Sequence, residues 1–160
     1  MNMKIKEMPI KNLPKKGYCE QCDDLVSFHV ECFSNQTHRV KDIDVTADEY
    51  IGICDKCGTH LFIDPIEDYN CKTYFDEYRK KAGLLTSKEI KAIRKKRGMS
   101  QRDLALFLSI GEKDIARYES GAIQTRAIDL MIRMVDDDQI FKKMSRVIEK
   151  TRLIASKSAA

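Results

Sequence analysis

The sequence predicts an α+β protein in which a helix joins a small β-rich N-terminal domain to an all-α C-terminal domain of five helices. Two observations predict this division. Residues 25–45 alternate between apolar and polar side chains, as half-buried strands do, whereas apolar side chains after residue 67 recur at helical spacing. The charge also changes, because residues 1–66 carry 8 basic and 11 acidic side chains and residues 67–160 carry 21 and 14.

These patterns divide the chain into five parts. They are a poorly ordered lead-in (1–17), a β-rich N-terminal domain (18–66), a connecting helix (67–83), an all-α C-terminal domain (84–150) and a frayed tail (151–160).

The N-terminal domain is predicted to contain a β-hairpin. Residues 25–33 are rich in β-forming side chains and read as a strand, residues 34–36 as a turn, and residues 38–45 as the returning strand. Residues 49–53 form a further short strand, and residues 61–63 close the domain before Pro65.

Two cysteine pairs flank this hairpin. Cys19, Cys22, Cys54 and Cys57 follow the pattern CxxC-x31-CxxC, which is typical of a structural zinc site with four thiolate ligands and no open position. A redox role for a CxxC pair favours a βαβ setting, which is not predicted here. His29, His38 and His60 are weaker candidate ligands. Cys32 is expected to be a small buried thiol and Cys71 to be partly exposed on the connecting helix.

The stretch from residue 84 to residue 124 predicts three helices with short turns. Thr86 and Glu89 form a capping box before the first helix, which ends at Gly98. Ser100 begins a second helix, residues 109–111 form a tight turn, and a third helix then runs to Gly121. Two short helices joined by a turn that contains glycine fit a helix-turn-helix, whose second helix lies in the major groove, although an ordinary helical bundle has similar spacing.

Six side chains of this stretch are candidate DNA contacts. Lys113 and Arg117 share one face of the third helix and are expected to reach base edges or phosphates. Gln101 and Arg102 open the second helix, where phosphate contacts are common. Lys96 and Arg97 belong to a basic run that would add nonspecific attraction to the DNA backbone. Glu119 is expected to tether the third helix through a nearby cation or cap.

Residues 125–136 and 139–150 predict a fourth and a fifth helix, and the apolar side chains of these two helices exceed what one small core can cover. They are Ile128, Met131, Ile132, Val135, Ile140, Met144, Val147 and Ile148. Because two recognition helices must also lie about one DNA turn apart, a homodimer that binds an inverted repeat is expected.

Other features of the sequence indicate the cellular compartment of the protein and the classes of protein to which it can belong. Residues 1–10 lack the apolar core of a signal peptide, and no run reaches about 18 apolar residues, so a cytoplasmic protein without a membrane span is expected. The six cysteines are then metal ligands or free thiols rather than a disulfide framework. The sequence shows no Ser-His-Asp set, no HExxH motif and no glycine-rich phosphate loop, so we do not expect an enzyme.

The sequence of residues 98–124 resembles the Xre/Cro type of helix-turn-helix, in particular at Met99-Ser100-Gln101 and Arg117-Tyr118-Glu119-Ser120-Gly121. Combined with the two CxxC pairs, residues 18–150 resemble the MqsA-type antitoxins of bacterial type II toxin–antitoxin systems, which have a YgiT-type zinc finger before this domain. The resemblance implies a homodimer that binds operator DNA, and an N-terminal domain that neutralises a toxin, often a ribonuclease.

Two differences from the antitoxin family leave an alternative function open. Lys113 stands where the family can carry an asparagine, so the operator need not match that of its relatives. The N-terminal domain is the variable half of the family, so the toxin is not implied by the resemblance. A stand-alone zinc-containing Xre-family regulator without a toxin partner is the second hypothesis.

Overall fold

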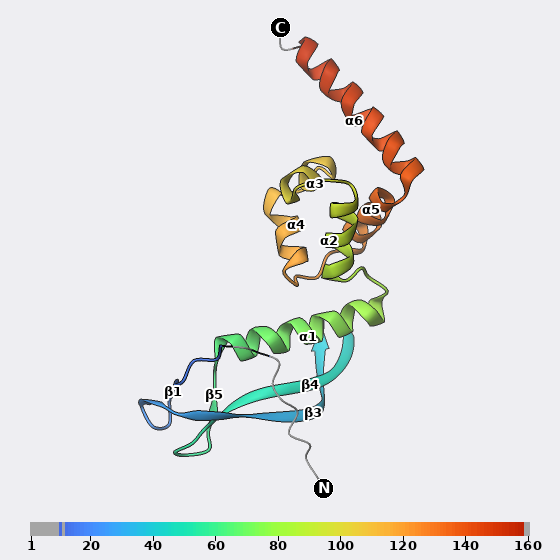
Figure 1. The fold of residues 1–160 in the computed structure, drawn as a ribbon. Coiled ribbons are helices and arrows are strands. Elements are labelled where there is room, and N and C mark those ends of the chain that lie inside the picture. The colour runs from blue at the N-terminus through green and yellow to red at the C-terminus, as the bar shows by residue number, and fades with distance from the viewer. Residues whose placement is uncertain (1–9, 11, 159–160) are drawn as a thin grey trace. The chain divides into compact units, whose positions relative to one another are not determined.

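The computed structural model describes the backbone of residues 10 and 12–158, and the side chains of residues 10 and 12–150. The chain forms two compact units, residues 1–82 and residues 83–160, and each is treated by itself below (Figure 1). The β-rich first unit and the helical second unit confirm the predicted fold class.

The N-terminal unit contains two small antiparallel sheets. The first pairs β1 (Gly17–Cys19) with β2 (Asp24–Val26), and the second has the order β3 (Phe28–Val40), β4 (Ile43–Cys54) and β5 (His60–Leu61). The buried face of these strands forms a core around the cysteine pairs that includes Val26, Tyr50 and Leu61.

The hairpin is longer than predicted, and its turn lies elsewhere. We expected the chain to reverse at residues 34–36, but β3 continues to Val40, which pairs with Ile43, so the turn is formed by residues 41–42. Lys41 has the positive φ of 52° that this tight turn requires. Residues 34–36 instead form a β-bulge in which Asn35 has a φ of 57°. The turn-forming residues at 34–36 therefore mark an irregularity within the strand, because a bulge uses the same left-handed conformation.

Helix α1 (Asp64–Ala82) belongs to the N-terminal unit rather than connecting the two units. It begins three residues before the predicted start at residue 67 and packs on β4. Every fourth residue on one face is buried, namely Ile66, Asn70, Tyr74 and Tyr78. Asn70 is polar at this face because its amide donates to the carbonyl oxygen of Tyr50 (2.7 Å) and accepts from the Tyr50 N–H (3.0 Å).

The C-terminal unit consists of five helices, as predicted. They are α2 (Ser87–Lys96), α3 (Gln101–Phe107), α4 (Glu112–Glu119), α5 (Arg126–Asp136) and α6 (Asp138–Ser158). The core between the first four contains Ile90, Leu104, Ala105, Ile115, Ile132 and Val135, each of them fully buried. The predicted capping box Thr86–Glu89 is present, and Ser100, predicted to begin the second helix, forms a further capping box with Asp103, so the starts of α2 and α3 follow from local sequence.

The two ends of the chain differ from expectation or lie outside the described residues. The last helix was expected to end near residue 150 with a frayed tail, but α6 continues to Ser158. Of the lead-in 1–17, residues 1–9 and 11 are outside the described part, and Gly17 already belongs to β1.

A buried carboxylate holds the segment that precedes α2 against α5. Asp129 on α5 is fully buried and accepts hydrogen bonds from the Leu85 N–H (2.7 Å), the Gln124 amide (3.0 Å) and the Arg133 Nε (2.7 Å). Arg133 also donates to the carbonyl oxygen of Gly83 (3.1 Å). Burial by itself raises the pKa of Asp129, but these donors outweigh it, and the pKa lies below its ordinary value.

Asp129→Asn is expected to destabilise the C-terminal unit by about 3 kcal/mol, because the amide removes the charge that Arg133 pairs with and points an extra donor at buried N–H groups. Since the pKa of Asp129 is lowered on folding, its contribution is present above the unfolded-state pKa and is lost as pH falls through the folded-state value. Urea unfolding followed by helical circular dichroism at pH 7 measures the first effect, and a series at pH values below about 4, where unfolded aspartate takes up a proton, measures the second. Glu149→Ala removes an exposed carboxylate of α6 and should change neither the stability of the C-terminal unit nor its pH dependence. Equal stability of Asp129→Asn and wild type would contradict the role of this network.

Candidate metal centre and nucleic-acid interface

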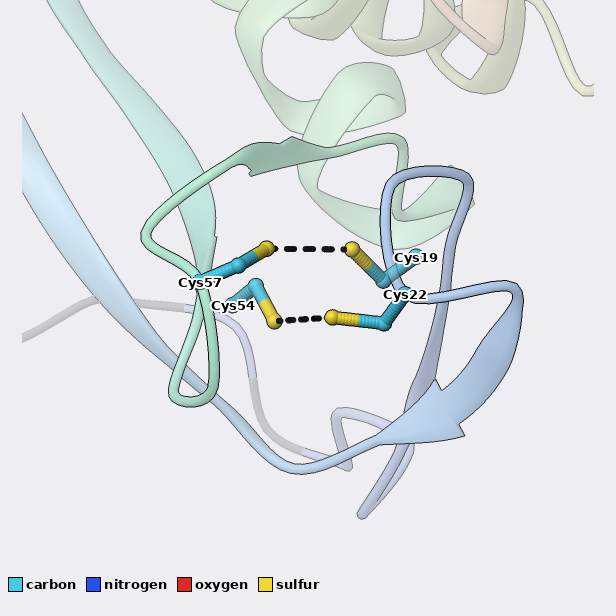
Figure 2. A group of neighbouring side chains, drawn as sticks. All are labelled: Cys19, Cys22, Cys54 and Cys57. Atoms are coloured by element: carbon cyan, nitrogen blue, oxygen red, sulfur yellow. Dashed lines mark hydrogen bonds between the residues drawn. The ribbon is translucent and has the colours of Figure 1, made fainter.

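The four predicted cysteine ligands lie together. Cys19 ends β1 and Cys22 lies in the β1–β2 turn, whereas Cys54 ends β4 and Cys57 lies in the turn that follows (Figure 2). The Sγ atoms of Cys19 and Cys57 are 3.5 Å apart and those of Cys22 and Cys54 are 3.9 Å apart. All four sulfur atoms lie within 4.8 Å of one another.

The backbone at each pair forms a tight turn that points both thiols inward. In the second pair, the Gly58 N–H donates to the carbonyl oxygen of Cys54 (2.9 Å) and the Lys56 N–H donates to the Cys54 Sγ (3.3 Å). Gly58, directly after Cys57, has a positive φ of 74°, which glycine adopts readily. Asp23 takes the equivalent place after Cys22 with a φ of 48°, a conformation that aspartate tolerates better than most side chains.

The sulfur spacing fits a tetrahedral metal ion. Four Zn–S bonds of about 2.3 Å at tetrahedral angles place the sulfur atoms roughly 3.8 Å apart. The Cys19–Cys57 and Cys22–Cys54 separations, 3.5 and 3.9 Å, lie on either side of this value, and the other sulfur–sulfur separations do not exceed 4.8 Å. With four protein ligands such a site is closed, so the arrangement is that of a structural metal centre rather than a catalytic one.

The thiols also differ in acidity. Hydrogen bonds with the hydroxyl and backbone of Thr59 lower the pKa of Cys57 to about 6. The neighbouring thiol of Cys57, followed by burial, raises the pKa of Cys22 to about 12. A metal ion that binds all four sulfur atoms must displace their protons, so its binding is coupled to pH.

The other candidate ligands are not part of this cluster. Among the described residues, the cluster contains the four cysteines and none of the histidines. His29 instead lies 2.7 Å from the Asp55 carboxylate, and the ring of His38 packs against Tyr74. Cys71 is exposed on α1, as expected, whereas Cys32 was expected to be buried and is only partly buried against the core.

The C-terminal unit has the geometry of a helix-turn-helix. Helix α3 ends at Phe107 and Leu108 is its C-cap, Ser109 has a φ of 55°, and Gly111 precedes α4. The tight turn predicted for residues 109–111 is therefore present, and Ser109 adopts its left-handed conformation. The Asp114 carboxylate accepts from the Gly111 N–H (3.2 Å) and so caps the start of α4.

A buried ion pair joins the first three helices of this unit. Arg94 on α2 donates through Nη2 to the Glu119 carboxylate at the end of α4 (2.9 Å), and the Gln101 amide of α3 donates to the same carboxylate (2.9 Å). Burial raises the pKa of Glu119, but the donors from Arg94 and Gln101 outweigh it and leave the pKa lowered. The predicted tethering role of Glu119 is confirmed, and its partner Arg94 comes from the basic run that sequence alone assigned to the surface.

Three of the predicted DNA contacts lie on an open surface. Lys113 is exposed on α4, and the Arg117 side chain, 69% exposed, makes a 3.5 Å contact with Asp114 one turn earlier. Arg102 is exposed at the start of α3 and lies 3.3 Å from Glu112. Such loose surface pairs leave these cations able to turn toward phosphate or base edges.

The side chains of Lys96 and Arg97, also predicted to contact DNA, instead bind groups at the end of α5. Lys96 Nζ binds the Asp136 carboxylate (2.7 Å), and Arg97 donates to the carbonyl oxygens of Val135 (2.8 Å) and Asp136 (2.6 Å). The Arg97 side chain is 11% exposed. These two residues therefore hold the end of α5, a role that the run of four basic residues did not reveal because their partners lie about 40 positions later.

The fold and the exposed basic side chains of α3 and α4 are those of a helix-turn-helix DNA-binding domain. Residues 90–132 match the family model described as helix-turn-helix. Together with the four-cysteine cluster, this domain fits a metal-binding transcription regulator of the Xre type. No curated protein matches the chain. In the part of the chain that the structure describes, none of the helices is both long and apolar enough to cross a membrane.

Proposed function

We propose that this protein is an antitoxin that represses its own operon through the C-terminal unit and neutralises a toxin protein through the N-terminal unit. The observation that carries the proposal is the presence, in one chain, of a helix-turn-helix and a four-cysteine centre on separate compact units. The charge of the units supports separate partners. Residues 1–82 carry 12 basic and 15 acidic side chains, and residues 83–160 carry 17 and 10. Only the second balance favours DNA.

Zinc is the proposed metal, with one ion per chain. Four thiolates in a closed tetrahedral set are its usual structural ligands. Cys19, Cys22, Cys54 and Cys57 would bind the ion, and the ion would hold the β1–β2 turn to the end of β4.

The proposed DNA contacts follow the open surface of α3 and α4. Lys113 and Arg117 face base edges or phosphates from α4, and Arg102 reaches a phosphate from α3. Gln101 orients α4 through Glu119 and retains its amide oxygen and one N–H for the DNA backbone.

A homodimer is proposed from the apolar side chains that remain uncovered on the last two helices. On α5, Leu130 and Met134 are about half exposed, and on α6 Val147 is 65% exposed. A second copy that covers these side chains would present two α4 helices to an inverted repeat. Sedimentation of the full chain at micromolar concentration tests this association, which a monomer would contradict.

Co-purification tests the antitoxin role. The chain is produced with the product of a short open reading frame beside its gene, and the partner is expected to co-elute and to stop growth when produced alone. Cys54→Ser is expected to lose the partner but to keep binding DNA, because the cysteines belong to the N-terminal unit alone. If no neighbouring product binds or is toxic, the protein is the alternative, a stand-alone Xre-family regulator.

A further inference from the structure

Arg97 joins the helix-turn-helix to the start of α6. It follows α2, and its guanidinium contacts both helices at the α5–α6 corner. It donates to the carbonyl oxygens of Val135 and Asp136, pairs with the Asp138 carboxylate (2.7 Å) and lies over the ring of Phe141 at 4.5 Å from the centroid. We refer to Arg97 with these four partners as the Arg97 clamp.

The chemistry of the Arg97 clamp favours a fixed geometry. The last carbonyl groups of α5 have no partner within their own helix, and a cation at a helix C-terminus is stabilised by the helix dipole. A planar guanidinium satisfies two of these carbonyl oxygens, pairs with a carboxylate and stacks on a ring at the same time. Because the Arg97 side chain is 11% exposed, solvent competes little for these contacts.

Among the described side chains of α6, those of its first turns make the ring and ion-pair contacts with the rest of the unit. Phe141 stacks on Phe107 of α3 with centroids 5.3 Å apart, and further along Val147 is largely exposed. Helix α6 has 21 residues, so it is about 31 Å long at 1.5 Å per residue. Its direction therefore depends on how its first turns are held.

We propose that the Arg97 clamp sets the direction of α6 and thereby the distance between the two α4 helices of the dimer. This inference rests on the proposed homodimer, in which a second copy covers Leu130, Met134 and Val147. A rotation of about 10° at one end of a helix of this length moves the other end by roughly 5 Å. That displacement exceeds one base-pair step of about 3.4 Å, so a change in the clamp would alter which half-site spacing the dimer prefers.

The experiment compares full-length wild type with Arg97→Lys. DNA sites are first selected from random sequence with wild type, and the half-site spacing of the selected inverted repeat is then changed in steps of one base pair. Wild type is expected to prefer one spacing over its neighbours by about tenfold. Arg97→Lys keeps one charge but cannot stack or form the forked contacts, and we expect a dimer whose preference falls to within about threefold or moves to another spacing. Affinity for a single half-site should not change, because Lys113 and Arg117 are untouched.

Arg146→Lys is the matched control, because Arg146 is exposed on α6 outside the Arg97 clamp, and it should keep the wild-type preference. Should Arg97→Lys fail to fold, Phe141→Leu removes the stacking partner and is expected to have the same effect. An unchanged spacing preference in the folded variant would overturn the role of the Arg97 clamp. A monomeric wild-type protein would overturn the proposed dimer, and the clamp's role in spacing with it.

Discussion

Arg117→Ala is expected to weaken binding to the protein's own promoter by about 1–3 kcal/mol and to flatten the preference for that promoter over scrambled DNA. Arg117 lies on the exposed face of α4, the second helix of the helix-turn-helix, where a base-edge contact discriminates between sequences. Its contact with Asp114 is long and exposed, so its loss costs the fold little. Fluorescence anisotropy with both DNAs at two salt concentrations measures affinity and specificity separately.

Arg146→Ala is the control for this variant, because it removes the same charge from α6 rather than from α4. It should leave the preference for the promoter unchanged. If Arg117→Ala weakens binding to the promoter and to scrambled DNA equally, Arg117 contacts only phosphate and another side chain recognises the bases.

Cys54→Ser is expected to abolish metal binding and unfold the N-terminal unit. Wild type purified without added metal should contain about one zinc per chain, and zinc binding to such sites contributes on the order of 10 kcal/mol to folding. Cys54 is almost fully buried and also accepts a hydrogen bond from Lys56, so its sulfur has both a metal-binding and a structural role. The near-ultraviolet signal of tyrosine should largely disappear, because five of the six tyrosines lie in this unit.

Cys71→Ser provides the matched control, since Cys71 is exposed on α1 and outside the cluster. It should retain the zinc and the tyrosine signal. In both variants the C-terminal unit should be as stable to unfolding as it is in wild type, because none of the cysteines lies beyond residue 82. A metal-free Cys54→Ser protein with an intact N-terminal unit would contradict a structural role for the metal.

Features set by neighbouring residues could be predicted from the sequence. The capping boxes that begin α2 and α3 each involve residues three positions apart, and both are present. The four cysteines could be grouped because a metal needs several soft ligands in one place, whatever fold supplies them. The outward position of Lys113 and Arg117 followed from helical periodicity.

Features set by distant residues could not be predicted. The basic run in α2 gave no sign that Arg94 pairs with Glu119 or that Arg97 binds the end of α5, because partner choice depends on packing. The hairpin turn was misplaced for a related reason. Residues 34–36 have good turn composition, but the pairing of β3 with β4 on both sides of them keeps the strand continuous. Tertiary pairing outweighs local turn preference at this position.

The bulge in β3 also bears on aggregation. Among the described residues, β3 pairs with β4 alone, so one edge of this 13-residue strand presents backbone N–H and C=O groups that another chain could extend into a larger sheet. The bulge interrupts the regular spacing of these groups near the middle of the strand, and the charged side chains Glu31 and Arg39 lie on either side of it. An interrupted, charged edge is a poor template for strand addition, so the same irregularity that lengthens the hairpin helps to keep separate molecules apart.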